Sequence, residues 1–297
     1  MTTTPTTHDT LTAPMPTRQL RGLDWQASLL TLGGVKWDSV ITESQAIELI
    51  HRAIELGVNT FDTASNYAKG DSERRLGKAL LGYRDNVFIA TKSSKRDYDG
   101  ARRDIEQSLK SLQTDTIDLF FIHSLEDDND LKKALDPQGV LKAIDEFKTA
   151  GHIRNVGVSG HWFKHNMIHA INDYPFQAVL LPIGLFNEAY NYSFPAEVIP
   201  VARNKDLAVL GMKVLAAGRA KHVADITPYI RFAINQDVDT AVVGVDSITQ
   251  LEQLVSIIKS RLTPLPIEET QALFDEARQV TQSFDPGEFS WVSHYKQ

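Results

Sequence analysis

Three short apolar segments in the first half of the chain are each followed by residues that can donate, accept or steer a proton. These residues are Asp62 and Tyr67 after the first segment, Lys92 after the second and His123 after the third. The carboxyl ends of parallel strands meet at one rim of a sheet or barrel. If the three segments are neighbouring parallel strands, the four side chains therefore share that rim.

These four residue types make a tuned proton donor. A tyrosine has a pKa of about 10, and a nearby ammonium group such as that of Lys92 favours its ionised form. A buried lysine needs a counter-charge, which Asp62 can provide, and His123 can donate a hydrogen bond to a substrate oxygen or relay a proton. Such a group suits an oxygen that gains negative charge, as in a carbonyl under reduction. A cofactor must then supply the hydride.

The composition excludes several classes of function. The chain has 297 residues, 42% of them hydrophobic, a net charge of -7 and no cysteine. Disulfides, thiol nucleophiles and thiolate metal sites are excluded, and a reducing compartment fits. The negative charge argues against nucleic acid or anionic membrane as a partner. No apolar run reaches about 18 residues, so we expect a cytoplasmic protein without a membrane segment.

The first 17 residues differ from the rest in being rich in threonine and proline. They lack the basic and apolar regions of a signal peptide. We therefore expect a disordered, flexible tail over residues 1–17, followed by one domain over residues 18–297. A short strand pair over residues 18–25 is expected to precede the main fold.

Strand-like and helix-like patterns alternate along the domain. The expected strands are residues 29–34, 58–61, 87–91, 117–122, 153–158, 177–181, 207–212 and 240–243. One expected helix is capped by Thr42, and another is capped by Asp71 or Ser72 and runs through Leu81. The other expected helices cover residues 100–112, 138–150, 162–171, 196–203, 228–235, 249–260 and 267–280. Thr42 and Gln45 match a capping box, and Gly57 matches a helix end. The strands are short and apolar throughout, as buried parallel strands are.

Eight strand–helix units in fewer than 300 residues predict an α/β fold, a (β/α)8 TIM barrel of one domain with a flexible N-terminal tail. A doubly wound open sheet is the alternative. That fold usually carries a Gly-x-Gly-x-x-Gly turn after its first strand, and residues 33–38 do not supply one. In a barrel the active site lies at the carboxyl ends of the strands, where the four residues are expected.

The surroundings of the four residues resemble the motifs of the aldo-keto reductase superfamily. The matching segments are Asn59-Thr60-Phe61-Asp62-Thr63-Ala64 with Tyr67, Ala90-Thr91-Lys92-Ser93, residues 118–123 and residues 153–159. The resemblance extends from about residue 18 to 280. It implies a barrel that binds NAD(P)(H) across its carboxyl face. It also implies Tyr67 as general acid/base, Lys92 as the group that lowers its pKa, Asp62 as the partner of Lys92, and His123 as the group that orients the carbonyl.

The resemblance also assigns a set of cofactor-binding residues. They are Gly33, Gly34, Asp62, Ser159, Gly160, Leu180, Met212, Lys213, Leu215, Gly218, Gly244, Gln250 and Gln253. The expected nicotinamide pocket departs from the family pattern. Gly160 stands where many relatives have Asn, Leu180 where they have Gln, and Met212 where a tyrosine often stacks on the ring. A methionine thioether packs against an aromatic face, with less control of geometry.

The adenosine end departs as well. Members that prefer NADP place Lys-Ser after the last strand, where Gly244 and Val245 stand here, and an arginine where Gln250 stands. Arginine is the stronger group for bidentate phosphate binding. Its absence favours NAD or relaxed use of both nucleotides. NADP stays open, because Arg219 or Lys221 can supply a cation.

Aromatic residues follow several of the strands and are expected at the mouth of the pocket. They are Trp37, Tyr98, Trp162, Phe163, Phe186 and Tyr190. We expect Trp37, Tyr67, His123, Trp162 and Phe186 to contact a small-molecule carbonyl or sugar substrate. Aromatic walls suit sugars, aryl carbonyls and steroids alike, so they do not select among these classes. The oligomeric state stays open.

Two further residue groups invite a metal site. His161, His165 and His169 are spaced four apart, and residues 126–130 are acidic. A solvated or capping role is expected for the histidines and a solvated loop for the acidic residues, so no metal is predicted. Two alternatives to a carbonyl reductase stay open on the same fold: a regulatory protein that binds the cofactor without turnover, and an isomerase or epimerase with tightly bound cofactor.

Overall fold

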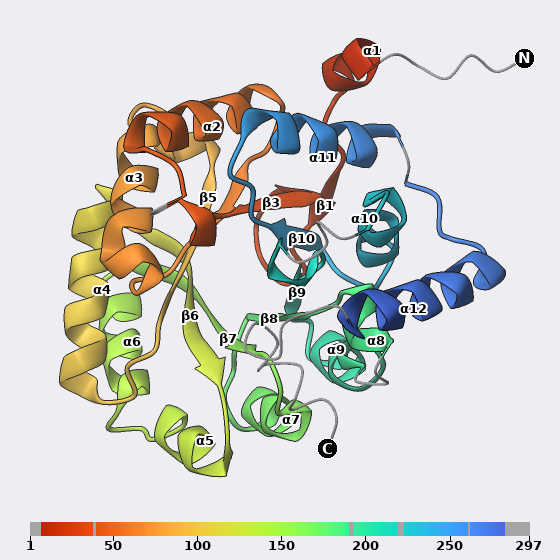
Figure 1. Ribbon diagram of the computed structural model, residues 1–297. Coiled ribbons are helices and arrows are strands. Elements are labelled where there is room, and N and C mark those ends of the chain that lie inside the picture. Colours follow the sequence, from red (N-terminus) through yellow and green to blue (C-terminus); the bar gives the residue numbers. More distant parts are fainter. Residues whose placement is uncertain (1–6, 38–39, 190–192, 219–222, 261, 283–297) are drawn as a thin grey trace, which may run out of the picture.

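The computed structural model describes residues 7–37, 40–189, 193–218, 223–260 and 262–282 (Figure 1). The strands are β1 (Thr17–Gln19), β2 (Gln26–Ser28), β3 (Leu30–Gly33), β4 (Thr60–Asp62), β5 (Phe88–Ser93), β6 (Ile117–Leu125), β7 (Ile153–Gly160), β8 (Ala178–Pro182), β9 (Ala208–Met212) and β10 (Thr240–Val243). The α-helices are α1 (Thr7–Thr12), α2 (Glu43–Glu55), α3 (Asp71–Ala79), α4 (Tyr98–Leu112), α5 (Asp128–Ala134), α6 (Val140–Thr149), α7 (Lys164–Asp173), α8 (Leu185–Glu188), α9 (Phe194–Asn204), α10 (Thr227–Ile234), α11 (Ile248–Ser260) and α12 (Ile267–Gln282). Three short 3-10 helices are η1 (Gly34–Lys36), η2 (Tyr67–Gly70) and η3 (Arg84–Asn86).

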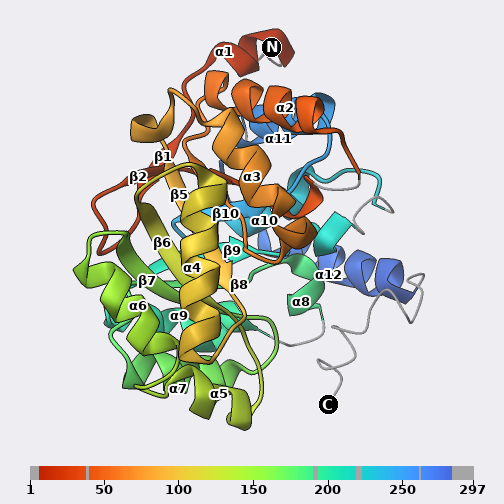
Figure 2. The same ribbon diagram turned by 90° about the vertical axis from the view of Figure 1, so that its left-hand side faces the viewer.

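Strands β3 to β10 form a closed, all-parallel barrel in chain order, in which β10 pairs with β3. Helices surround the strands in both views (Figures 1 and 2). The prediction of a (β/α)8 barrel is therefore confirmed. The register places Asp62 opposite Ala90 and Lys92 opposite Phe121. Because all eight strands are parallel, their carboxyl ends share one rim.

The barrel is closed at its other end by a hairpin. Strands β1 and β2 pair antiparallel. A strand pair is therefore present before the barrel, but its second strand lies beyond the predicted range 18–25. Leu20 and Leu23, in the connecting turn, join the apolar cluster inside the barrel with Phe88, Leu119 and Phe121. A larger apolar cluster fills the space between the outer face of the barrel and the helices. The interior is thus packed from the amino end.

Two of the predicted helix caps can be compared with the structure. Thr42 caps α2 and forms both hydrogen bonds of the capping box with Gln45, and Gly57 follows the helix at φ +92°. The cap predicted for α3 is wrong. Gly70, at φ +95°, is the N-cap, and Asp71 is the first helical residue. The Ser72 hydroxyl is used elsewhere, because it donates to the carbonyl of Gly34.

The structure corrects two predictions about irregular segments. Residues 7–12 form α1, which packs on α11, and Lys259 donates to the carbonyl of Leu11 at 2.9 Å. The prediction of a disordered tail therefore fails for residues 7–17, and residues 1–6 lie outside the described part. The acidic residues 126–130 do not form a simple solvated loop. Asp127 caps α5 through the backbone N–H of Asp130.

Among the described residues, none of the helices combines the length and the apolar character that crossing a membrane requires.

Candidate active site

Lys92 and Asp62 form a buried ion pair at the ends of β5 and β4. The Lys92 Nζ lies 2.7 Å from each carboxylate oxygen of Asp62, donates to Oδ2, and donates again to the carbonyl of Thr63 at 2.6 Å. Lys92 is 1% exposed and Asp62 3%. Burial opposes the charge on Lys92, but Asp62 and Tyr67 outweigh that effect and raise its pKa above 10.5. The ammonium group is therefore charged at every physiological pH.

Tyr67 lies beside this ammonium group. It is the first residue of η2, and the Lys92 Nζ stands 4.9 Å from the centroid of its ring. Burial raises the pKa of Tyr67 above 10, and Lys92 offsets part of that rise. The expectation that Lys92 lowers this pKa holds for the direction of its own contribution, but burial outweighs it. The phenol is therefore protonated at neutral pH.

His123 completes the group from β6. Its ring meets that of Tyr67 edge to face, with centroids 5.8 Å apart and an interplanar angle of 76°. Its Nδ1 lies 3.3 Å from the Ser94 hydroxyl. Burial, followed by the positive charge of Lys92, lowers the pKa of His123 well below 6.5. The structure thus brings the four predicted side chains together, with the imidazole neutral.

A cavity of about 650 Å3, counting the space at its open mouth, adjoins Asp62 and Tyr67. Eight of the predicted cofactor residues line it: Gly33, Asp62, Leu180, Met212, Lys213, Leu215, Gly218 and Gly244. Val35, Lys36, Val214, Ala217, Val242 and Val243 also line it and were not predicted. Lys36 was recognisable in principle, because it lies three residues after the end of the first barrel strand, on the same rim as the other site residues.

The cavity has the properties of a dinucleotide site. Lys36 and Lys213 bring two cationic side chains to its wall. A Cβ on Gly244 would stand 3.1 Å from the carbonyl oxygen of Gly33. The absence of a side chain at Gly244 therefore keeps the backbone at this part of the cavity wall accessible. Ala216, Ala217 and Gly218 follow one another with φ of +47°, +56° and +90°. Cationic groups and the exposed residues Ala217 and Gly218 suit a diphosphate, and the apolar Leu180 and Met212 suit a flat ring. The residues present therefore fit a nicotinamide dinucleotide.

Five of the predicted cofactor residues do not line the cavity. The Ser159 hydroxyl accepts from the backbone N–H of Ser124 at 2.9 Å and so serves the strand beside it. A Cβ on Gly160 would meet the Met167 sulfur at 2.6 Å, and one on Gly34 would meet the Ser72 hydroxyl at 2.6 Å. Gln250 accepts from the N–H of Asp246, and Gln253 is exposed on α11. Their cofactor contacts stay predictions.

The predicted aromatic mouth is wrong at three positions. Trp37 is fully buried, and Phe186, 1% exposed, stacks on Tyr229 at 5.1 Å. Tyr98 begins α4 and donates to Glu146 of α6 at 2.7 Å, outside the barrel. Trp162 is half-buried beside His161, with ring centroids 5.4 Å apart. Tyr190 lies outside the described residues.

His161 belongs near the site rather than to a histidine row. It precedes α7, whereas His165 lies within the helix and contacts Asp128 at 3.3 Å. Burial, then the charges of Lys213 and Lys92, lower the pKa of His161 to about 3. Within the described ranges no three His, Asp or Glu side chains are grouped to hold a metal ion. The sequence signal for His161 is its place directly after the barrel strand β7.

Comparison with known proteins adds independent evidence. A sequence model of the aldo/keto reductase family matches residues 29–229. The Bacillus subtilis oxidoreductase YqkF is 28% identical over 220 residues, which cover 69% of this chain and 66% of that protein. The Bacillus subtilis aldo-keto reductase YhdN is 32% identical over 193 residues, which cover 60% of this chain and 54% of that protein. The match thus spans between about half and two thirds of these relatives.

A solved structure extends the comparison to the fold. The aldo-keto reductase of Bacillus halodurans, determined in its holo form, superposes with a TM-score of 0.74 at 23% identity. The superposition covers 89% of this chain and 96% of that one. At this level of identity the likeness concerns the barrel itself.

Proposed function

Because this chain belongs to the aldo-keto reductase family of oxidoreductases, we propose that it interconverts a carbonyl compound and an alcohol with NAD(P)(H). The observation that carries the proposal is the buried series of contacts from Asp62 through Lys92 to Tyr67, beside a cavity that suits a dinucleotide. The substrate is an aldehyde, a ketone or a sugar. Tyr67 acts as the general acid when the carbonyl is reduced and as the general base when the alcohol is oxidised.

The residues that line the cavity fall into two groups, according to the part of the coenzyme that each group would hold. Lys36 and Lys213, with the backbone around Gly218, would hold the diphosphate. Leu180 and Met212 would pack against the nicotinamide. A bound nicotinamide coenzyme supplies the hydride that no side chain can supply.

Reduction of a carbonyl adds a hydride to carbon and a proton to oxygen. Tyr67 gives that proton from its hydroxyl group, which burial keeps protonated. The Lys92 ammonium group then stabilises the phenolate that remains, and Asp62 holds the ammonium in place. In the direction of oxidation the same phenolate accepts the proton of the alcohol.

His123 orients the oxygen that receives the proton. Its ring is neutral and lies edge to face with Tyr67. When Nδ1 accepts from the Ser94 hydroxyl, the ring proton is on Nε2. That N–H then donates to the substrate oxygen and stabilises its developing negative charge.

The coenzyme preference follows from the charges near the adenosine end. Gly244 lines the cavity where relatives selective for NADP carry Lys, and Gln250 is bonded to Asp246. We infer that NADH binds at least as tightly as NADPH, since neither residue supplies a cation for the 2′-phosphate.

Parallel titration with NADH and NADPH, followed by the protein fluorescence, tests both inferences. The better ligand is then used with a panel of aldehydes, ketones and sugars. We expect binding of NADH and oxidation of the coenzyme in proportion to the alcohol formed. Coenzyme that binds without turnover of any carbonyl would favour a regulatory role, and conversion of a sugar without net change in the coenzyme would favour an isomerase.

A further inference from the structure

Strand β6 loses its regular pairing at the point where it delivers His123. Ile122 pairs with Val158 of β7, and the next pair is Leu125 with Gly160. Two residues of β6, His123 and Ser124, therefore stand opposite one residue of β7. Ser124 adopts φ +55°, which is uncommon for a residue other than glycine. Such a bulge turns a side chain to a new direction but leaves backbone groups without their ladder partners.

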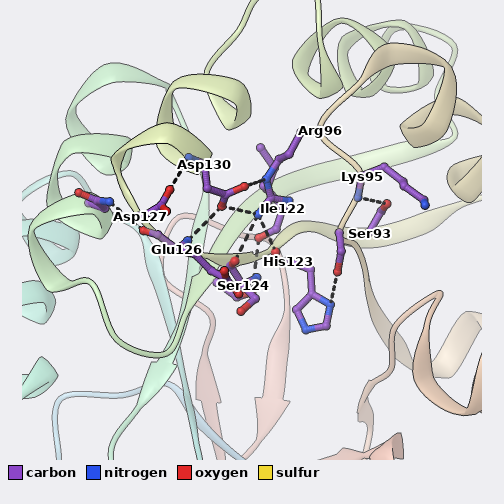
Figure 3. A network of polar contacts seen from close by, with 12 residues as sticks. Ser93, Lys95, Arg96, Ile122, His123, Ser124, Glu126, Asp127 and Asp130 are labelled. Carbon is purple, nitrogen blue, oxygen red and sulfur yellow. Dashed lines mark hydrogen bonds and ion pairs between the residues drawn. The ribbon is translucent and has the colours of Figure 1, made fainter. Parts of the chain in front are cut away.

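Side chains from other elements take over those backbone groups (Figure 3). The Arg96 Nη2 donates to the carbonyl of His123 at 2.9 Å and to that of Ser124 at 3.2 Å. The Ser159 hydroxyl accepts from the N–H of Ser124 at 2.9 Å. The peptide that carries the imidazole is thus held from both sides.

Arg96 is itself fixed by Asp130 of α5. The guanidinium donates twice, from Nε to Oδ1 and from Nη2 to Oδ2, both at 2.9 Å. Asp130 is in turn oriented, because its Oδ2 accepts from the N–H of Glu126 and its own N–H donates to Asp127. The Arg96 side chain is 11% exposed. A planar guanidinium with two fixed donors holds geometry better than an ammonium group.

The His123 ring packs edge to face against Tyr67, with centroids 5.8 Å apart. Its polar contact, to the Ser94 hydroxyl, is long at 3.3 Å. Neither contact fixes the backbone from which the ring extends, so the direction of the ring also depends on how that backbone is held.

We propose that Arg96, locked by Asp130, is a positioning residue that fixes the bulged His123–Ser124 peptide and so aims the His123 imidazole at the substrate oxygen. The inference rests on the proposed function. Arg96 contacts the backbone carbonyls of His123 and Ser124, so we place its action on the direction of the imidazole and not on the substrate itself.

Three variants test the role of Arg96. Arg96→Met removes all its hydrogen bonds, Arg96→Lys keeps the charge without the planar fork, and Asp130→Asn frees the guanidinium. Arg102→Met is the control, because Arg102 is an exposed arginine of α4, the helix that follows Arg96, and it pairs with Glu106. We expect kcat to fall by up to roughly 100-fold in Arg96→Met and less in Arg96→Lys, with the Kd of the coenzyme within about twofold of the parent. The control should keep its kcat.

A double-mutant cycle separates positioning from general stability. In a His123→Ala background, Arg96→Met should change kcat by no more than about twofold, because the residue it positions is gone. An equal loss of kcat with and without His123 would overturn the proposal. If Arg96→Met does not fold, Arg96→Lys and Asp130→Asn carry the same cycle.

The carbon-bound ring protons of the histidines, observed by NMR in the apoprotein, give a second readout. The His123 signal, assigned by its loss in His123→Ala, should be single and sharp in the parent protein. In Arg96→Lys it should broaden or divide, and an unchanged signal would contradict the proposal. This measurement needs no turnover. A parent protein that reduces no carbonyl would refute the proposed function, whereas the NMR comparison would still decide whether Arg96 positions His123.

Discussion

Lys92 is the residue on which the charges of the site depend. It neutralises Asp62 and contacts Tyr67, and both it and Asp62 are nearly inaccessible to solvent. A buried charge is tolerated only when it is paired and hydrogen-bonded. A buried ion pair contributes little net stability. We therefore assign the pair the role of placing a positive charge beside Tyr67.

Removing one member of the pair is expected to destabilise the fold. Lys92→Met leaves Asp62 buried without a partner, and the free energy of unfolding should fall by roughly 3–5 kcal/mol. The double variant Lys92→Met, Asp62→Leu, which removes both charges, should lose clearly less. Urea unfolding of the two proteins provides the comparison. Equal stability losses would show that the unpaired charge is not the cause.

The pH dependence of reduction follows from two opposite pKa shifts. The pKa of Tyr67 is raised by burial, so its proton remains available up to and beyond pH 10. The pKa of His123 is lowered well below 6.5 by burial and by Lys92, so the ring stays neutral as the pH falls. We expect kcat/KM for carbonyl reduction to be flat from about pH 7 to pH 9. A titration centred near pH 6.5 in the pH–rate profile would contradict the neutral imidazole.

At the scale of elements, each end of the barrel has a separate task. The β1–β2 hairpin packs the amino end, whereas the loops and short helices after the strands form the site at the carboxyl end. Leu20 is fully buried among the residues that fill the barrel interior. Its contribution should accordingly concern stability and not ligand binding.

Leu20→Ala tests this division. A buried leucine replaced by alanine costs about 2–5 kcal/mol, because contacts are lost and a cavity remains. The free energy of unfolding should fall by that amount while the Kd of the coenzyme stays within about twofold. A marked loss of coenzyme affinity in a folded variant would show that the two ends are coupled.

The elements also show where sequence patterns stop being informative. The capping box of α2 was predictable because Thr42 and Gln45 lie three residues apart and act locally. The cap of α3 was not, because Ser72 bonds to Gly34, 38 residues away in the chain. Ser159 was expected to bind cofactor, but its hydroxyl serves the β6 bulge, which depends on pairing between strands.

At the scale of the molecule, the barrel follows from repetition. Each strand–helix unit has a local signature, and eight of them close the sheet, so both the fold and the common rim of the four residues were predictable. Burial of individual aromatic residues was not. Trp37 follows a strand as a rim residue would, yet its side chain is fully buried in the apolar cluster between the barrel and the helices. Tyr98 contacts Glu146 of α6 outside the barrel.

The stability of the whole molecule should fall in acid partly because of His161. Below about pH 6.5 the unfolded chain binds a proton there, whereas the folded protein does not until about pH 3. The unfolded state thus binds more protons, so stability falls as the pH falls. Between pH 7 and 5 this histidine should account for about 2 kcal/mol. In His161→Gln the free energy of unfolding, measured with urea at pH 7 and pH 5, should change by about 2 kcal/mol less than in the parent protein. An equal change in both proteins would contradict the lowered pKa of His161.

The central claim is that the Tyr67 hydroxyl carries the proton, and Tyr67→Phe tests it most directly. The change removes one oxygen and keeps the ring that contacts Lys92 and His123. Steady-state turnover of the best carbonyl substrate should fall by about 100-fold to 10,000-fold, the range of general acid catalysis, while the Kd of the coenzyme is unchanged. Tyr98→Phe, on the outer surface, should keep full activity. Full activity in Tyr67→Phe would contradict the account.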